Sequence, residues 1–410
     1  MAHYNPNVGN SPLTRRNLLG LSAAGMLTLA ADGIANAAAS VIAIRADVLY
    51  PVSSPGIKNA VVIIRGGRIA SVGAGLSVPA GAKVLHAAAV IPGLVDPHSY
   101  LGVYGQNSEP VDAVTPDFQT LDAFVPDDRH VLAAVAAGIT TALVAPGNSG
   151  VLAGKAGLVH LGSTSEVVAS YAAQKISVSA DAAAADKNPT SRDGAAVLFG
   201  KALTAAKSGL GVSSTTQSTP LIGIPTGLSQ RAEALLPLLN RKVPGIFHAP
   251  GADDAEIALE LIARFGLKAV LLHTADAYRI AGNIAKAGVG VALSPLSLTD
   301  SDRTLGNAAK LSAAGVKVSF CSDAPLTAPD SLRRSACLAV QFGLPEAVAL
   351  AAITQTAAQH AGAAGFAGSI SPGLPADLVL LNGDPLDYGT RIEGVVSRGK
   401  LVTGGSAHAS

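Results

Sequence analysis

Between residues 138 and 320, short apolar runs alternate with stretches of helical periodicity such as 253–265. The runs cover 138–145, 245–248, 268–273, 289–293 and 316–320. This alternation indicates parallel strands joined by helices. The number of strands favours a (β/α)8 barrel over an open sheet. We therefore predict an α/β protein whose TIM barrel spans residues 92–371.

Both ends of the chain have a different pattern, that of short strands and tight turns. Residues 40–91 contain apolar runs on either side of a hairpin turn at 65–68, and residues 372–410 contain similar runs with a turn at 398–400. Neither piece is large enough to bury a core alone. We expect the two ends to pair into one small composite β-sandwich, with the barrel inserted between them. A chain of 410 residues suits one large domain and one small one.

The first 39 residues read as a targeting segment. Paired arginines, Arg15 and Arg16, precede an apolar run, and Ala35-Asn36-Ala37 supplies small residues for cleavage. We interpret this as a twin-arginine signal peptide, which predicts export by the twin-arginine machinery to the periplasm or beyond. The alternative is a membrane anchor, but the apolar run is shorter than the roughly 20 residues that a spanning helix needs.

The overall composition limits the classes of binding partner that we expect. The net charge is +1 and only 14% of residues are charged, so nothing predicts a nucleic-acid partner. We expect a small-molecule substrate, and the sequence makes no prediction of oligomeric state. Two interpretations stay open for Cys321 and Cys337: a disulfide, if their Cα atoms lie within about 7 Å, or two small buried apolar side chains.

Four metal-binding side chains come at the ends of predicted strands. The apolar stretch 92–100 presents His98 at its end, and His248, His273 and Asp323 occupy similar positions. A closed barrel brings the carboxyl ends of its strands together, so these side chains converge although they are far apart in sequence. Imidazole and carboxylate ligands suit zinc or a similar divalent ion.

Several motifs resemble one known family. They are 92–98 (Pro-Gly-Leu-Val-Asp-Pro-His), 137–141, 248–254, 272–273, 322–323, 372–379 and 383–386. Together these motifs resemble the amidohydrolase superfamily, and in particular its imidazolonepropionase-like branch. The resemblance implies a metal-bearing barrel beside a composite β-sandwich, and hydrolysis of amide-type or ring C–N bonds.

The resemblance also implies roles for individual residues. His98 matches the first histidine of the strand-one pair, His248 and His273 match the ligands on strands five and six, and Asp323 matches the aspartate of strand eight. Tyr100 stands where the second histidine of the pair is expected. Because a phenol ionises near pH 10, we expect Tyr100 to fill the pocket or to hydrogen-bond the substrate.

A second departure from the family is found near Ala180, where a glutamate is expected, with Asp181 as an uncertain stand-in. These departures predict one divalent ion, zinc by ligand type, rather than a two-metal centre. His248 and His273 would hold the ion with His98 or Asp323, which leaves a position open for water. Asp323 would take the proton of that water and return it to the leaving nitrogen.

Two other functions remain open. The chain is either an enzyme of this kind or a binding or accessory protein that has lost part of the ligand set. A metal-free hydrolase with Ser99 or Ser149 as nucleophile is a weaker alternative, because no oriented triad is visible in the sequence. Substrate specificity would depend on the loops at 101–126 and 209–227.

The remaining polar residues are interpreted as structural. We expect no ligand among His3, His86, His130, His160, His360 and His408. Arg192, Lys175 and Lys201 are expected on solvated helix faces, and 146–150 is expected to form a loop over the barrel mouth.

Overall fold

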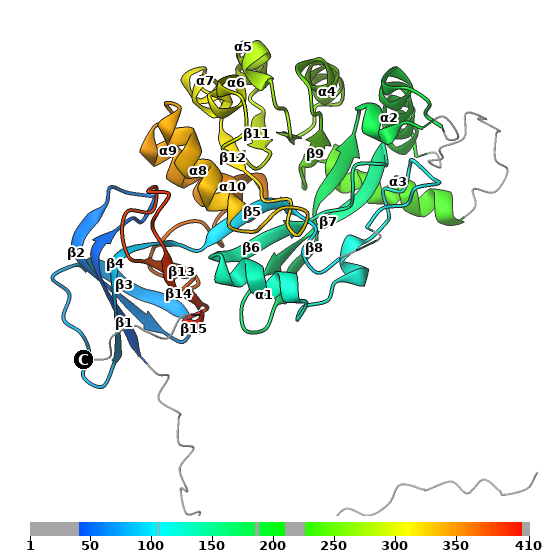
Figure 1. Ribbon diagram of the computed structural model, residues 1–410. Coiled ribbons are helices and arrows are strands. Elements are labelled where there is room, and N and C mark those ends of the chain that lie inside the picture. Colours follow the sequence, from blue (N-terminus) through cyan, green and yellow to red (C-terminus); the bar gives the residue numbers. More distant parts are fainter. Residues whose placement is uncertain (1–40, 104, 106, 185–187, 210–225, 404–410) are drawn as a thin grey trace, which may run out of the picture. The chain divides into compact units, whose positions relative to one another are not determined.

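The structure is a computed structural model that describes residues 41–103, 105, 107–184, 188–209 and 226–403. Its larger sheet has eight strands that follow one another in chain order (Figure 1). They are β5 (Leu94–Ser99), β6 (Ile139–Val144), β7 (Leu152–His160), β8 (Glu166–Ser177), β9 (Gly245–His248), β10 (Ala269–Leu272), β11 (Gly290–Leu293) and β12 (Val318–Phe320). The predicted segment 1–39 lies outside the described residues.

The eight strands almost close into a barrel. The residues after β12 return to β5, where the Tyr100 amide donates to the Ala324 carbonyl at 2.7 Å and the Asp323 amide donates to the His98 carbonyl at 3.3 Å. The predicted α/β barrel is thus confirmed.

One strand departs from the all-parallel pattern expected for the barrel. Strand β7 pairs antiparallel with both β6 and β8, whereas the other neighbouring strands pair parallel. The segments 145–151 and 161–165 that flank β7 are too short to hold a crossover helix, so they can only form hairpins. Because two reversals cancel, β8 again runs in the direction of β9, and its end reaches the same edge of the sheet.

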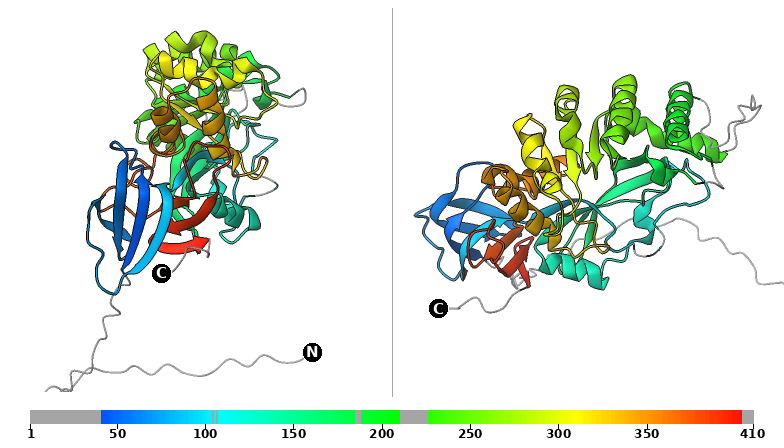
Figure 2. Two further views of the ribbon diagram at one scale, coloured as in Figure 1. Left: turned by 60° about the vertical axis from the view of Figure 1, so that its left-hand side comes forward. Right: turned by 45° about the horizontal axis from the view of Figure 1, so that its top comes forward.

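Helices follow most of the parallel strands and pack on their outer side (Figure 2). They are α1 (Arg129–Ala136), α2 (Arg192–Lys207), α3 (Thr226–Leu239), α4 (Ala252–Phe265), α5 (Ala281–Ala287), α6 (Asp302–Leu305), α7 (Asn307–Ala313), α8 (Ser331–Gln341), α9 (Glu346–Ala352) and α10 (Gln355–His360), with 3-10 turns at Thr120–Ala123, Ala180–Ala182 and Ala277–Ile280. Helix α4 shows why they form: its apolar residues recur on one buried face, and Gly266, with φ 64°, ends it. Within the described residues, none of these helices has the length and apolar character needed to cross a bilayer.

The second sheet combines both ends of the chain, as predicted (Figure 1). Its seven strands are β1 (Ile42–Leu49), β2 (Ile57–Arg65), β3 (Arg68–Ala74), β4 (Lys83–Pro92), β13 (Leu378–Leu381), β14 (Ile392–Ser397) and β15 (Lys400–Thr403), in the order β15-β14-β13-β4-β1-β2-β3. Ile44, Val62, Leu85, Leu378 and Val396 share one buried cluster. The sheet therefore curls around a core to which both chain ends contribute.

Two tight turns of this sheet pack against each other. Both have positive φ at their two central residues, Gly66–Gly67 in one and Arg398–Gly399 in the other. The Ala376 amide donates to the Gly67 carbonyl and the Ala376 carbonyl accepts from the Gly399 amide, each at 2.9 Å. The segment 372–379, one of the family-like motifs, therefore joins two hairpins and has a structural role.

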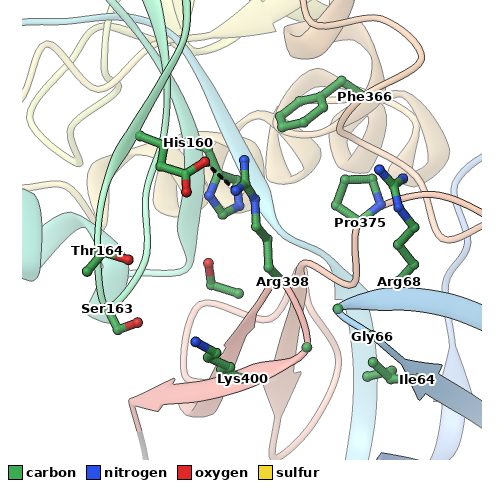
Figure 3. Close-up of a pocket in the computed structure, with 14 residues that line it drawn as sticks. Ile64, Gly66, Arg68, His160, Ser163, Thr164, Phe366, Pro375, Arg398 and Lys400 are labelled. Carbon is green, nitrogen blue, oxygen red and sulfur yellow. Dashed lines mark hydrogen bonds and ion pairs between the residues drawn. The ribbon is translucent and has the colours of Figure 1, made fainter. Parts of the chain in front are cut away.

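This junction also contacts the barrel. Asp377 Oδ1 accepts from the Arg398 amide at 2.7 Å and lies 3.0 Å from Nε2 of His160, the last residue of β7. Figure 3 shows the cavity of about 620 Å³ beside these turns, in which Arg398 pairs with Glu166. None of the five predicted site residues lines this cavity.

Candidate active site

The structure brings the four predicted ligand residues together at the carboxyl ends of the barrel strands. His98 belongs to β5 and His248 is the last residue of β9. His273 directly follows β10, and Asp323 comes three residues after the end of β12. The strand ends of a barrel meet at one mouth, which is why residues this distant in sequence become neighbours.

The four side chains form a hydrogen-bonded chain. Asp323 Oδ1 lies 2.7 Å from His98 Nδ1 and 3.0 Å from His273 Nε2. His273 Nδ1 in turn lies 3.1 Å from His248 Nδ1. The imidazole rings are edge to face, with centroids 5.1 Å apart for His98 and His273 and for His248 and His273.

Lys175 and Asp181 extend this chain at its two ends. Lys175 Nζ lies 2.7 Å from His98 Nε2, and Asp181 Oδ2 lies 2.6 Å from His248 Nε2. The prediction that Lys175 lies on a solvated helix face is wrong, because it is fully buried in β8. Lys175 lies in the mixed segment 172–178, which also contains Gln174 and Ser177, so there was little signal in the sequence for its burial. Asp181, the uncertain stand-in, does reach the site.

Burial controls the protonation of this cluster. It lowers the pKa of Lys175 to about 7, although the Asp323 charge opposes the shift. Burial and the Lys175 charge lower the pKa of His98 to about 3. For Asp323, burial alone would raise the pKa, but the charges and hydrogen bonds of His273 and His98 hold it well below its usual range. The site thus has a neutral imidazole beside an ionised carboxylate.

Backbone strain helps to direct two of these side chains. His273 has φ 68° and Asp323 has φ 53°, a left-handed conformation that costs a non-glycine residue about 1 kcal/mol or more. Both residues follow the last residues of a strand, where the chain turns sharply away. The turn leaves the two side chains facing each other rather than following the alternation of the strand.

Asp96 joins the first and last strands of the barrel, a role that its place inside the motif 92–98 did not predict. Its Oδ1 accepts from the amides of Ser322 at 3.0 Å and His98 at 3.3 Å, and the Ser322 hydroxyl donates to Oδ2. Asp96 is fully buried, and burial raises its pKa to about 7 against these hydrogen bonds. It therefore holds the backbones that carry His98 and Asp323 in register.

Tyr100 fills the place of the missing histidine. Its ring stands edge to face on His98 with centroids 5.0 Å apart, and it is 7% exposed. Burial raises the pKa of its phenol. Tyr100 is thus a protonated wall of the pocket in this structure.

Cys321 is the unexpected neighbour of the site. Both cysteines are free thiols, so of the two interpretations the structure supports buried apolar side chains and not a disulfide. Cys321 Sγ lies 3.6 Å from Asp323 Oδ1 and donates to the Leu293 carbonyl at 3.3 Å. One donor atom each from His98, His273, Cys321 and Asp323 lie within 4.8 Å of one another, which makes them a candidate metal centre. His248 is not in this compact group.

The described residues that were expected to be structural lie elsewhere. His160 pairs with Asp377, His360 bonds the Ser319 hydroxyl at 2.7 Å, and His86 is exposed on β4. Arg192 and Lys201 lie on α2, as expected, with their side chains toward solvent. His3, His408 and most of the loop 209–227 fall outside the described residues.

The serine-hydrolase alternative gains no support from Ser99. Its hydroxyl points to the Leu143 carbonyl at 3.5 Å rather than to an imidazole. A serine nucleophile needs a base within hydrogen-bond reach, and the contact of Ser99 does not provide one.

Comparisons with known proteins agree with this architecture. Residues 255–402 match the amidohydrolase family, and none of the curated proteins matches the sequence. The structure resembles an amidohydrolase from Thermotoga maritima MSB8, with a TM-score of 0.78 and 25% identity, over 89% of this chain and 100% of that one.

Two further structures are similar at 17% identity, which supports the fold alone. One is an adenosine deaminase from Xanthomonas campestris with bound zinc, with a TM-score of 0.52 over 88% of this chain and 92% of that one. The other is the ochratoxinase of A. niger, with a TM-score of 0.53 over 90% of this chain and 96% of that one. The resemblance to amidohydrolases is thus confirmed, while its imidazolonepropionase-like branch stays a prediction.

Proposed function

We propose that this protein is a metal-dependent hydrolase that cleaves a carbon–nitrogen bond of a small molecule, such as a cyclic amide, a lactam or an acylated amino acid. A single divalent ion, zinc by ligand type, would be held by His98 and His273 with a third ligand from the same cluster. The assignment to the imidazolonepropionase-like branch belongs to this proposal and rests on the sequence motifs.

The observation that carries the proposal is a missing proton in the hydrogen-bonded chain. Asp323 Oδ1 can only accept, so His98 Nδ1 and His273 Nε2 both donate to it. A neutral His273 then accepts at Nδ1, and His248 must donate from its own Nδ1. That leaves His248 Nε2 without a proton, although it faces the Asp181 carboxylate at 2.6 Å.

The cluster therefore needs one positive charge more than neutral imidazoles and ionised carboxylates provide. An imidazolium is disfavoured here, because burial and the Lys175 charge lower the pKa of His248. If His98 Nδ1 and His273 Nε2 held a divalent cation, they would no longer carry protons. His273 could then donate from Nδ1 to His248, and His248 from Nε2 to Asp181, so that no imidazolium is needed. This favours a metal centre over a set of histidines that merely satisfy one another, as in a non-catalytic accessory protein.

In the proposed hydrolysis, the ion and the protein have different roles. When bound, a zinc-like ion polarises the scissile carbonyl and lowers the pKa of a water molecule toward ~7. Asp323 is ionised and accepts at Oδ1, and within the described residues no side chain donates to its Oδ2. Oδ2 is thus available to take the proton of the attacking water and to deliver it to the leaving nitrogen. Tyr100 would orient or enclose the substrate.

Replacing Asp323 tests this assignment. We expect Asp323→Asn to lower kcat by about 10²- to 10⁴-fold, the usual contribution of a general base. The measurement uses zinc-loaded protein and a panel of N-acyl amino acids, lactams and cyclic amides. Asp193→Asn, an exposed carboxylate on α2, is the control and should keep full activity. Undiminished turnover by Asp323→Asn would remove Asp323 from the mechanism.

Export is a separate proposal that depends on residues 1–39 alone. The paired arginines and the short apolar run support a twin-arginine signal and a periplasmic or secreted protein. Export in the folded state would allow a metal to be loaded before the protein crosses the membrane. Arg15→Lys and Arg16→Lys together should leave the protein in the cytoplasm.

A further inference from the structure

The proposed metal centre lacks one of the protein ligands that the family pattern would supply. Tyr100 stands at the position of the second histidine, where it is buried with its ring edge to face on His98, and so offers a phenol where an imidazole is expected. Asp323 would then have to serve both as ligand and as base. A catalytic zinc site commonly has three protein ligands and a fourth position for water, so a third ligand other than Asp323 is needed.

Cys321 lies where such a ligand is needed. Cys321 directly follows β12 and is fully buried. Its Sγ lies 3.6 Å from Asp323 Oδ1. The same oxygen is 2.7 Å from His98 Nδ1 and 3.0 Å from His273 Nε2. Two imidazole nitrogens and one sulfur therefore surround Asp323 Oδ1, and all these donor atoms lie within 4.8 Å of one another. The cysteine belongs to a cluster with metal-binding partners on two other strands.

We propose that His98, His273 and Cys321 are the three protein ligands of the metal, with the Cys321 thiolate in place of the missing imidazole. The inference rests on the function proposed above. It leaves Asp323 free to act as the base and places His248, with its partner Asp181, beside the ion rather than on it. Binding would convert the thiol to a thiolate and release one proton.

A thiolate ligand also sets the choice of metal. Sulfur favours soft or borderline ions such as Zn²⁺, Co²⁺ and Cd²⁺ over Mg²⁺ and Mn²⁺, which prefer oxygen ligands. We therefore expect Zn²⁺ to compete with Co²⁺ for the site and Mg²⁺ to leave Co²⁺ in place at any practical excess.

The direct test is the absorption spectrum of the chelator-treated protein after reloading with Co²⁺. A thiolate ligand gives an intense sulfur-to-cobalt charge-transfer band in the near ultraviolet, which nitrogen and oxygen ligands do not give. We expect this band in the wild type, its loss in Cys321→Ser and its retention in Cys337→Ser. Cys337 is the matched control, because it is a buried free cysteine on α8 outside the site.

Affinity supplies a second readout. Cys321→Ser should bind Zn²⁺ at least about 100-fold more weakly, since even the loss of a residue that only supports a ligand costs about 10- to 100-fold. Circular dichroism of both variants checks that they are folded, and Cys321→Ala replaces Cys321→Ser if the serine variant is not.

The outcomes separate this inference from the proposed function. Co²⁺ binding without the band, or with the same band in Cys321→Ser, would overturn the cysteine ligand and leave a metal hydrolase intact. Failure of the wild type to bind any of these ions would instead overturn the proposed function itself.

Discussion

At the scale of single residues, the sequence predicted the ligands that follow apolar strands but not the groups that complete the site. His98, His248 and His273 stood out because each follows an apolar run, and Asp323 because it follows the predicted strand Val-Ser-Phe-Cys-Ser. Lys175, Asp96 and Cys321 lie within their segments rather than at the predicted strand ends. At such positions the sequence does not show whether a side chain points into the site or toward solvent. Only the closed barrel shows which way these side chains point.

His360 allows a residue-scale prediction of pH dependence. It is buried at the end of α10 with its Nδ1 on the Ser319 hydroxyl, and burial, assisted by the Lys317 charge, lowers its pKa to about 4. The unfolded chain takes up this proton near pH 6.5. His360 therefore costs the folded state nothing above pH 6.5 and destabilises it progressively as the pH falls toward 4.

The test compares His360→Gln with the wild type in urea unfolding at pH 7.5 and at pH 5. We expect the free energy of unfolding of the variant, relative to that of the wild type, to be about 2 kcal/mol higher at pH 5 than at pH 7.5. His86→Gln, exposed on β4, is the control and should track the wild type at both values. The same difference for His360→Gln at both pH values would show that His360 is not held neutral.

At the scale of elements, strand ends were predictable and strand direction was not. The predicted run 245–248 is β9, and the run 268–273 contains β10. The antiparallel strand β7 was missed because the period of its apolar residues does not distinguish direction. The short segments that flank it were the available signal, since a parallel connection needs a dozen or more residues.

The two packed hairpin turns give an element-scale prediction. Gly67 has φ +77° and a Cβ there would lie 2.9 Å from the Arg398 carbonyl oxygen, whereas Gly66 has φ +56° and open space. Gly66→Ala should cost about 1–2 kcal/mol for its left-handed conformation alone. Gly67→Ala should cost clearly more, because it also separates the turns. Equal losses in the free energy of unfolding would mean that the turns do not depend on close packing.

At the scale of the whole molecule, the α/β barrel and the composite sheet followed from the sequence pattern alone. The composite sheet was predictable because neither end of the chain has enough apolar residues for a core of its own. The cavity beside the junction was not, because it forms where two hairpin turns and the end of β7 meet. A cavity of this kind depends on how complete strands and turns pack against one another, and a local sequence pattern does not predict that packing.

The proposed function requires that the cluster at the barrel mouth bind a metal ion. Plasma mass spectrometry of the purified protein, after zinc reloading and dialysis, tests it most directly in the wild type, in a His98→Ala, His273→Ala double variant and in His160→Ala. His160 is the control, a buried histidine paired with a carboxylate outside the site. We predict about one zinc ion per chain in the wild type and in His160→Ala, and none in the double variant. A wild type that stays metal-free after reloading would rule out a metal hydrolase and favour an accessory protein whose histidines only hydrogen-bond one another.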